Sequence, residues 1–321
     1  MISDRRERLL RARRRLSGML IEGLFYGGMS RMAALTPAAR PGLHGIRRHR
    51  GLWYGKHPAH RLDVYEPVGR AGARPVVMYV HGGAFRAMSK DTHWLMGLIF
   101  ARRGYLVFNV DYRLAPEFRF PAALEDLSRA LAFVRREAPR FGGDPDRLVL
   151  AGESAGANLV TALTVASCYR RDEPFARSIF EEDYAPKAVV PFCGILQVSE
   201  PDRLLQEPIW FFERDAILSC AELYLPNEVS VSAALADPLK VIESQTPDRP
   251  LPPFFVSVGT SDRLLPDSRR LALALEDRAV PHRARYFDRE IHAFQALVFR
   301  RAARECWRDL FAYLNELGLG A

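Results

Sequence analysis

The sequence of 321 residues has few cysteines and no long apolar run. Its four cysteines are far apart and form no C-x-x-C pair, so we expect buried free thiols and no disulfide framework. Such thiols fit a reducing compartment, and we expect a cytoplasmic protein. No segment approaches the roughly 18 consecutive apolar residues that a membrane-spanning helix needs, so we expect no transmembrane helix.

Charge is unevenly distributed along the chain. Residues 1–50 contain twelve arginines and three acidic residues, a net charge of +9, whereas the remaining residues sum to −1. The net charge of +8 for the whole chain therefore belongs to an N-terminal arm, and the body is nearly neutral. Aromatic residues do not alternate with these arginines and no known binding module surrounds them, so we expect no nucleic-acid partner.

The N-terminal arm, residues 1–45, is expected to form a cap segment. Four leucines fall on one helical stripe, with the arginines largely off it: Leu9, Leu16, Leu20 and Leu24. Three interpretations are open: the helix packs over the mouth of an active site, it lies on an anionic membrane surface, or it belongs to a secretion signal. The third fits least, because Glu22 interrupts the apolar part and no A-x-A cleavage site follows.

The body of the chain, residues 46–321, alternates between strand-like and helix-like segments and is expected to be the catalytic domain. Strands are expected within 45–67 and at 75–80, 105–110, 147–151, 188–193, 253–258 and 283–287. Helices are expected at 91–103, at 120–137, from 154 onward, at 266–279 and near the C-terminus. This alternation indicates βαβ units, and so an α/β fold with a central, mostly parallel sheet flanked by helices.

Residues 195–250 break this alternation and contain Trp210, Phe211 and Phe212, several prolines and scattered acidic residues. In an α/β sheet, an insertion at this point lies beyond the carboxyl ends of the strands, where ligands bind. We expect the part at about 195–225 to form a lid, with the three aromatic side chains walling a substrate pocket. Core packing of the same side chains is the alternative.

A serine pattern, Gly152-Glu153-Ser154-Ala155-Gly156, follows the apolar run 147–151 and precedes a helix-like segment. G-x-S-x-G at a strand-to-helix turn is typical of a nucleophile elbow, which projects the serine hydroxyl above the sheet. The glycines are needed where the strained turn brings backbone segments too close for a Cβ. The pattern also arises by chance in a chain with 22 glycines, so it needs partners.

The buried strand 75–80 runs directly into His81-Gly82-Gly83-Ala84-Phe85. Two consecutive glycines here allow backbone N–H groups to turn into a cleft and hold a developing oxyanion. The N–H groups of Gly82, Gly83 and Ala155 are the expected donors, and such donors are each worth about 3–4 kcal/mol of barrier. An ordinary glycine turn is the alternative.

A serine hydroxyl becomes a good nucleophile when a base takes its proton and a carboxylate orients the base. Downstream of Ser154 the chain has only His282 and His292. His292 lies after a strand and before the last helix, the expected place for the base, whereas His282 begins a strand. Asp262 follows the strand 253–258 and is the expected acid.

Two other aspartates fit this role less well. Asp267 falls inside the following helix, and Asp237, which precedes a proline, comes too early in the chain and indicates a turn. The chemistry of a serine, a histidine and an aspartate needs no metal and no cofactor, and we expect none.

Taken together, these motifs resemble the hormone-sensitive-lipase-like branch of the α/β-hydrolases, the bacterial carboxylesterases with an H-G-G-G oxyanion motif. The resemblance extends from about residue 60 to the C-terminus. Its most specific part is the run Asp111-Tyr-Arg-Leu-Ala-Pro-Glu117, which in that family supports the oxyanion loop from behind. The other matching segments are 81–83, 120–122, 152–156, 237–239, 259–262 and His292.

The resemblance implies an α/β-hydrolase fold with a helical cap, built from the N-terminal segment and an insertion after the sixth strand. It implies hydrolysis of short- to medium-chain carboxylic esters through an acyl-enzyme, and its triad falls on Ser154, Asp262 and His292. We expect Phe85 and Glu153 to line the pocket with the aromatic residues of the lid. The alternatives are an amidase or arylformamidase on the same scaffold and a non-catalytic ligand-binding receptor.

Two departures from the family pattern concern single glycines. Ala84 replaces the third glycine of the oxyanion motif, and Ala293 replaces the glycine of H-G-F around the base, a change expected to shift that loop slightly. As partners we expect a small-molecule ester, contact of the basic arm with an anionic membrane, and a homodimer formed through an edge strand, as is common in the family.

Overall fold

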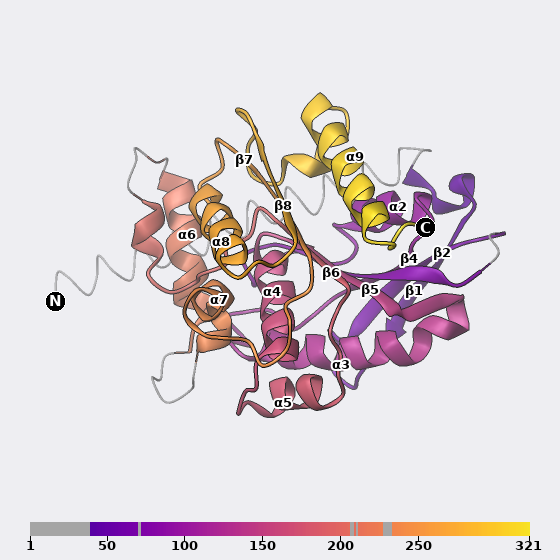
Figure 1. The fold of residues 1–321 in the computed structure, drawn as a ribbon, viewed down its shortest axis with the longest axis horizontal. Coiled ribbons are helices and arrows are strands. Elements are labelled where there is room, and N and C mark those ends of the chain that lie inside the picture. Colours follow the sequence, from indigo (N-terminus) through magenta and orange to yellow (C-terminus); the bar gives the residue numbers. More distant parts are fainter. Residues whose placement is uncertain (1–38, 70–71, 206–208, 210, 227–232) are drawn as a thin grey trace.

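The structure is a computed structural model that describes residues 39–69, 72–205, 209, 211–226 and 233–321 (Figure 1). Expectations for residues 1–38, among them the leucine stripe, and for Trp210 fall outside the described residues. The strands are β1 (Ile46–Trp53), β2 (Arg61–Pro67), β3 (Arg74–Val80), β4 (Leu106–Val110), β5 (Gly143–Glu153), β6 (Ala188–Phe192), β7 (Phe254–Gly259) and β8 (His282–Phe287).

The helices connect these strands and lie on both faces of the sheet (Figure 1). The α-helices are α2 (Trp94–Arg102), α3 (Ala122–Glu137), α4 (Ala155–Cys168), α5 (Pro174–Glu181), α6 (Phe211–Tyr224), α7 (Pro238–Ser244), α8 (Leu265–Asp277) and α9 (Arg301–Glu316). Short 3-10 helices are η2 (Pro41–His44), η3 (Ala138–Phe141), η4 (Pro201–Leu204), η5 (Ala234–Ala236) and η6 (Phe294–Ala296).

All eight strands belong to one sheet, in the order β1-β2-β4-β3-β5-β6-β7-β8. The pairs β1–β2 and β2–β4 are antiparallel, and every other neighbouring pair is parallel. The prediction of a central, mostly parallel sheet flanked by helices is confirmed. Because the strands from β3 to β8 run in the same direction, their carboxyl ends lie along one edge of the sheet, where ligands bind in such folds.

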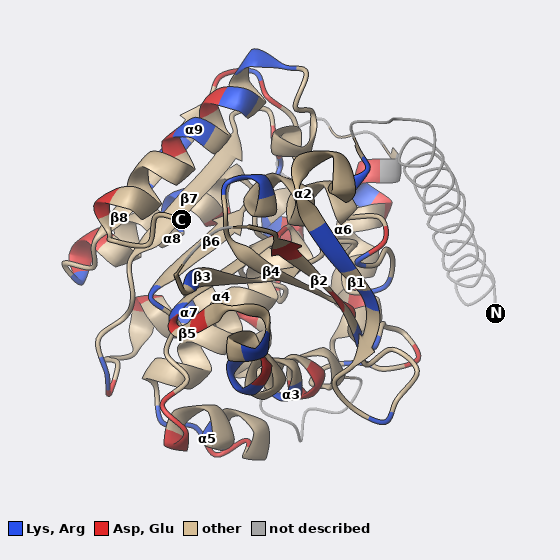
Figure 2. Ribbon diagram, turned by 90° about the vertical axis from the view of Figure 1, so that its right-hand side faces the viewer, with Lys and Arg blue, Asp and Glu red and all other residues tan. Residues whose placement is uncertain are grey.

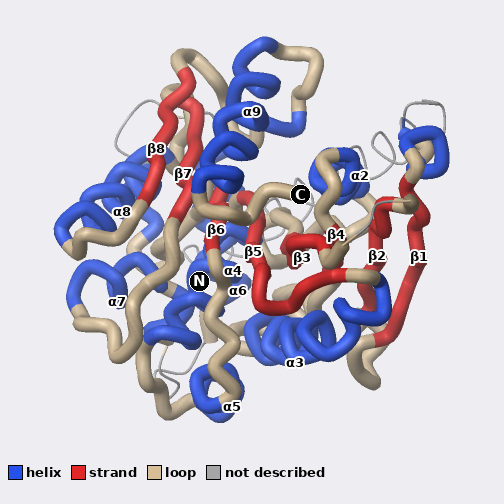
Figure 3. Tube along the Cα trace, turned by 45° about the vertical axis from the view of Figure 1, so that its right-hand side comes forward, coloured by secondary structure: helices blue, strands red, loops and turns tan. Residues whose placement is uncertain are grey.

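The apolar strands are buried on both faces, which explains why they read as continuous runs. Along β3 the side chains alternate between two clusters: Val76, Met78 and Val80 belong to one, and Val77 and Tyr79 belong to the other. The first cluster includes residues of α3, α4, α5, α7 and α8, and the second includes residues of α2 and α9. Figure 3 shows α3 and α5 on one side of the sheet and α2 and α9 on the other.

Two helices that the sequence analysis missed begin with proline. Pro174 starts α5 and Pro238 starts α7, each at the first helical position, where its missing N–H would have no partner anyway. Asp237-Pro238 indicated a turn in the sequence, and no helix was expected to begin near Pro174. The strand expected at 147–151 is the buried part of the longer β5.

Helix α6 lies in the insertion that the resemblance implies as part of a helical cap, and it packs on the loop after β3. The Phe85 ring stacks on Tyr224 of α6 with a centroid distance of 3.7 Å. The N–H of Phe120 donates to the Tyr224 carbonyl at 2.8 Å, and Arg119 donates to the Glu222 carbonyl at 2.7 Å. The insertion is therefore tied to the body of the sheet by α6, and its role as a lid stays a prediction.

The run Asp111–Glu117 lies behind the oxyanion loop, as the resemblance implies. The Tyr112 hydroxyl donates to the His81 carbonyl at 3.0 Å, and the Tyr112 ring stacks on the His81 imidazole. The N–H of Ala115 donates to the Phe85 carbonyl at 2.9 Å. These contacts fix both ends of the loop that begins at the carboxyl end of β3.

Charged side chains lie mainly on the outer elements. Helix α9 carries both signs, and β1 at the edge of the sheet carries arginines (Figure 2). Among the described residues, no helix is both long and apolar enough to cross a membrane. The four cysteines are buried and free, as expected.

One carboxylate in the core joins three parts of the fold. Asp126 of α3 is fully buried and accepts hydrogen bonds from His60 and Arg113, both at 2.8 Å. His60 precedes β2 and Arg113 belongs to the run behind the oxyanion loop. A buried carboxylate with such partners is costly to disrupt, because the remaining cation keeps its desolvation penalty.

We expect Asp126→Asn to lower the free energy of unfolding by about 3 kcal/mol, the low end for a broken buried pair, since Glu125 still contacts Arg113. Asp146→Asn is the matched control, because the Asp146 side chain is 81% exposed in its pair with Arg135. Its effect should stay within about 0.5 kcal/mol. Urea denaturation followed by circular dichroism measures both, and equal losses would contradict the assignment.

Candidate active site

Ser154 lies at the turn from β5 into α4, at the carboxyl end of the sheet. Its backbone has φ 55° and ψ −117°, a strained conformation for a residue with a side chain. The N–H of Ser154 donates to the Phe192 carbonyl at 2.9 Å, which ties the turn to the end of β6. This is the geometry of a nucleophile elbow, with the serine held at the apex.

The glycines on either side of Ser154 are required by close backbone contacts. A Cβ on Gly156 would lie 2.1 Å from the Val80 carbonyl oxygen and 2.6 Å from that of His81. A Cβ on Gly152 would lie 2.5 Å from the Gly156 carbonyl oxygen. The elbow therefore packs directly against the end of β3.

The loop after β3 brings two glycines to the same place. A Cβ on Gly82 would lie 3.0 Å from the Glu153 carbonyl oxygen and 3.3 Å from the Ser154 Cβ, so the loop lies tightly against the elbow and a side chain here would have to displace it slightly. Gly83 has φ 108°, and the next residue, Ala84, has φ 53°. Within the described chain, no protein acceptor is hydrogen-bonded to the N–H of Gly82, Gly83 or Ala155. These three groups are therefore available to a ligand.

His81 fixes the orientation of this loop. Its imidazole is fully buried, and burial, together with the nearby His93, lowers its pKa to about 3. The neutral ring donates from Nδ1 to the Gly82 carbonyl at 2.7 Å. The Gly82 carbonyl and the Gly83 N–H belong to one trans peptide and point in opposite directions. Holding the carbonyl inward therefore directs the N–H of Gly83 outward.

Asp262 and His292 form a hydrogen-bonded pair at the neighbouring strand ends. His292 Nδ1 lies 2.8 Å from Asp262 Oδ2, and Asp262 Oδ1 accepts the N–H of Leu264 at 2.9 Å. The Asp262 side chain is buried and that of His292 is 43% exposed. Burial alone would lower the pKa of His292, but the facing Asp262 carboxylate outweighs it and holds that pKa well above 6.5.

Backbone packing sets the distance between Asp262 and His292. A Cβ on Gly259, at the end of β7, would lie 2.0 Å from the Glu290 carbonyl oxygen, so the two loops touch through their main chains. Ala293 adopts φ 56° and ψ 28°, the left-handed conformation that glycine would take in the family pattern. The loop thus keeps a glycine-like backbone at Ala293, at a steric cost of about 1 kcal/mol or more.

The structure does not join Ser154 and His292 directly, since within the described residues no hydrogen bond links their side chains. Catalytic hydrogen bonds are often long or misaligned without a substrate. The elbow and the base loop are linked instead through Glu153. One of its carboxylate oxygens accepts from Gln295 at 2.7 Å, and the other lies 2.7 Å from His93 Nε2.

Glu153 is buried, and burial alone would raise its pKa, but His93 and Gln295 hold that pKa below its usual value. It is therefore a carboxylate with both oxygens engaged. Glu153 was expected in the pocket lining, and no local pattern indicates these partners, which lie 60 and 142 residues away along the chain.

The other expected pocket residues have varied surroundings. Phe85 is fully buried against α6, and Phe211 at the start of α6 is 60% exposed. Trp210 and the side chain of Phe212 lie outside the described residues. The lining of the pocket therefore stays a prediction.

The alternative acids and the alternative base have structural partners. Asp267, in the first turn of α8, accepts the Leu196 N–H at 2.9 Å and pairs with Arg203 at 2.6 Å. Asp237 precedes α7 and accepts the Val198 N–H at 2.6 Å. His282 lies 3.0 Å from the Val280 carbonyl at the opposite end of β8 from His292.

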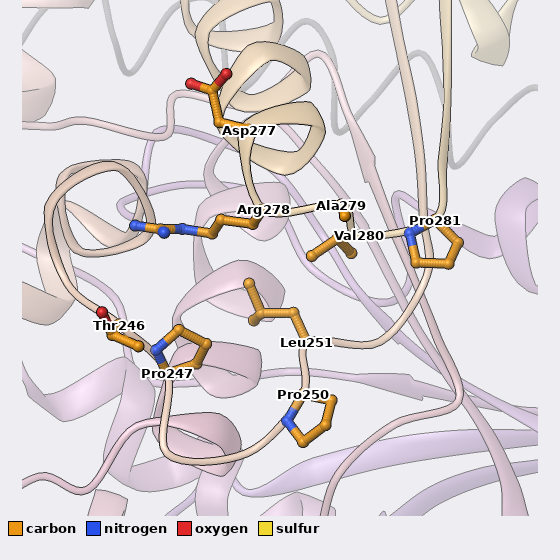
Figure 4. Close-up of a pocket in the computed structure, with 9 residues that line it drawn as sticks. All are labelled: Thr246, Pro247, Pro250, Leu251, Asp277, Arg278, Ala279, Val280 and Pro281. Atoms are coloured by element: carbon orange, nitrogen blue, oxygen red, sulfur yellow. The ribbon is translucent and has the colours of Figure 1, made fainter.

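A shallow hollow lies at the opposite end of the sheet. It has a volume of about 370 Å³ and lies between the residues that precede β7, such as Leu251, and the turn before β8 (Figure 4). Arg278 in its wall donates to the backbone carbonyls of Ile242 and Gln245. The hollow is therefore separate from the constellation at the carboxyl ends of the strands.

Comparison with known proteins places these residues in a family. Residues 77–296 match a family model described as the alpha/beta hydrolase fold. A protein of Oryza sativa subsp. japonica, named a probable isoprenylcysteine alpha-carbonyl methylesterase (ICMEL1), is 32% identical over 222 residues, 68% of this chain and 50% of that protein. The carboxylesterase NlhH of Mycobacterium tuberculosis is 29% identical over 259 residues, 80% of this chain and 78% of that protein.

Solved structures agree on the fold. An esterase of Pyrobaculum calidifontis is 22% identical with a TM-score of 0.74 and covers 94% of each chain. The esterase LipW of Mycobacterium marinum is 24% identical with a TM-score of 0.74, over 94% of this chain and 90% of that one. The chain spans about half or less of the length of the first curated relatives it matches.

We expect Gly156→Ala to destabilise the protein by about 1–3 kcal/mol, as overpacking does, because the methyl group would collide with the main chain after β3. The direction of the stability change is informative, because replacing glycine by alanine at an ordinary helical position stabilises a protein by about 1 kcal/mol. Gly42→Ala is the control, because a Cβ there meets nothing within 4 Å. Denaturant midpoints compare the two variants, and a neutral Gly156→Ala would contradict the packing argument.

Proposed function

The chain belongs to the alpha/beta hydrolase fold family, and on that premise we propose that it hydrolyses carboxylic esters through an acyl-enzyme on Ser154. The observation that carries the proposal is the hydrogen bond of 2.8 Å between His292 Nδ1 and Asp262 at the sheet edge that also presents Ser154. This order of serine, acid and histidine along the chain is the order of the family's triad.

In the proposed reaction, His292 Nε2 takes the proton of the Ser154 hydroxyl as its oxygen attacks the ester carbonyl. Asp262 accepts the Nδ1–H of His292, which fixes the tautomer and stabilises the imidazolium. The imidazolium then gives its proton to the departing alkoxide. Water, activated by the same imidazole, attacks the acyl-enzyme, and the acid leaves with Ser154 restored.

The negative oxygen of the tetrahedral intermediate would be bound by the N–H groups of Gly82, Gly83 and Ala155. The support is that these three groups have no other acceptor in the described chain and that Gly82 lies against the Ser154 Cβ. His81 acts as a positioning residue through the Gly82 carbonyl. Donors fixed before the reaction stabilise developing charge without reorganisation.

The proposed substrates are esters of short- to medium-chain acids. The relatives named a carboxylesterase and an isoprenylcysteine methylesterase motivate a comparison of acyl esters with methyl esters of carboxylic acids. A series of p-nitrophenyl esters from acetate to laurate, with a methyl ester series beside it, defines the preference. Membrane contact by the arm, a homodimer and a cytoplasmic location stay predictions.

We expect Ser154→Ala to abolish hydrolysis of short p-nitrophenyl esters, with a loss of about 10⁴-fold or more, because the nucleophile is removed. The circular dichroism spectrum should match that of the parent chain. Ser261→Ala, in the turn after β7, is the matched control and should retain activity. Unchanged turnover of Ser154→Ala would refute the proposal.

The rate of ester hydrolysis should fall as the pH decreases, with a midpoint above pH 6.5. The Asp262 carboxylate raises the pKa of His292 well above that value, and only the neutral imidazole can accept the Ser154 proton. Protonation as the pH falls through the raised pKa therefore removes activity. In Asp262→Asn the carboxylate that raises the pKa of His292 is lost, while the burial that lowers it remains. The midpoint should therefore move to lower pH. A profile of kcat/KM against pH measures both, and a midpoint below 6.5 in the parent chain would contradict the assignment.

A further inference from the structure

The proposed reaction leaves one side chain at the site without a role. Cys193 follows β6 with its thiol fully buried, and its N–H donates to the Ser257 carbonyl at 2.8 Å. Its sulfur, a carboxylate oxygen of Asp262 and a ring nitrogen of His292 all lie within 4.8 Å of one another. These residues come from three separate loops, after β6, β7 and β8, so local sequence gives no hint of the cluster.

The three donors form a recognisable ligand set. A thiolate, an imidazole and a carboxylate are the groups that bind Zn²⁺, and three protein ligands with one open position make a four-coordinate site. Metal–ligand bonds of about 2.0–2.3 Å put the donor atoms of a tetrahedral site roughly 3.3–3.8 Å apart. The donors here lie within 4.8 Å of one another, and a cation would be bound as the Asp262–His292 pair opens from 2.8 Å and the thiol moves closer.

The exposure of the donors determines how a cation would reach the site, and their chemistry determines which cation would bind. The His292 side chain is 43% exposed while that of Asp262 is buried, so a cation would enter past the imidazole and keep water as its fourth ligand. A thiolate ligand favours Zn²⁺ and Cd²⁺ over Mg²⁺, which prefers oxygen ligands. We infer that Cys193, Asp262 and His292 form an inhibitory binding site for a thiophilic divalent cation such as Zn²⁺.

The bound cation would inhibit ester hydrolysis because of the ring nitrogen of His292 to which it binds. Asp262 faces Nδ1 of His292 at 2.8 Å, so a cation bound by both residues takes Nδ1. The Cys193 thiol releases one proton to solvent, and the imidazole proton moves from Nδ1 to Nε2. Nothing is oxidised or reduced. An imidazole protonated at Nε2 cannot accept the Ser154 proton, so the inference rests on the proposed function, with the cation as inhibitor and not as cofactor.

The kinetic test uses the full chain after treatment with a chelator. We expect Zn²⁺ and Cd²⁺ to inhibit p-nitrophenyl ester hydrolysis, EDTA to restore the rate, and Mg²⁺ to have no effect. Cys193→Ser should raise the inhibitory Zn²⁺ concentration at least tenfold, each variant being compared with its own metal-free rate. Cys306→Ser is the matched control, because its buried thiol lies outside the ligand group and contacts Ser257 Oγ.

A binding test separates the metal site from the reaction. Cd²⁺ added to the Ser154→Ala chain should give the ultraviolet charge-transfer band of a cadmium thiolate, and Cys193→Ser should remove it. A band without ester hydrolysis in the parent chain would refute the proposed function and leave the metal site standing. If Cys193→Ser does not fold, Cys193→Ala takes its place.

Three results would overturn the inference: a parent chain that gives no band, a band that survives the loss of Cys193, or inhibition by Zn²⁺ that is equally strong in Cys193→Ser. A band in a parent chain that hydrolyses esters without inhibition by Zn²⁺ would overturn the inhibitory role.

Discussion

The site depends on the approach of main chain to main chain where β5 turns into α4. Gly156 rests on the carbonyl oxygens of Val80 and His81 with no space for a methyl group. The same contact presses the loop after β3 against the elbow, where Gly82 meets Ser154. Ser154 and the loop of Gly82 and Gly83 are therefore positioned by a single packing contact, and a second one, between Gly259 and Glu290, positions Asp262 and His292.

Much of this arrangement could be predicted from the sequence. Continuous apolar runs indicated the buried strands, because strands covered on both faces need no alternation. The rule that parallel strands share a carboxyl edge then brought Ser154, Asp262 and His292 together from positions 30 and more residues apart. The pairing of Asp262 with His292 follows that expectation closely.

What the sequence could not show are contacts between distant residues that share no local pattern. Glu153 reads as the variable position of a motif, yet its partners are His93 and Gln295. Cys193 reads as one more buried thiol, yet it lies beside the acid and the base. Asp237-Pro238 indicated a turn, because the local sequence does not distinguish a proline at a first helical position from one in a turn.

Glu153 helps to hold the loop that carries His292 in place. Its carboxylate joins the elbow to Gln295, three residues after His292, and Gln295 is itself fixed by the Trp307 indole N–H, which donates to its carbonyl. The loop that carries His292 is thus held by the buried Glu153 carboxylate and by Trp307 of α9. Loops at active sites that are supported in this way keep catalytic groups within the narrow tolerance that chemistry needs.

The pKa values of the two imidazoles His81 and His292 are shifted in opposite directions. With its pKa lowered to about 3, the His81 ring is neutral near neutral pH and donates to the Gly82 carbonyl as an amide would. The orientation of the Gly82–Gly83 peptide is then the same whether or not His292 is protonated. For redesign, position 81 therefore needs a planar side chain that donates to the Gly82 carbonyl and stacks on Tyr112, a requirement of shape and not of basicity.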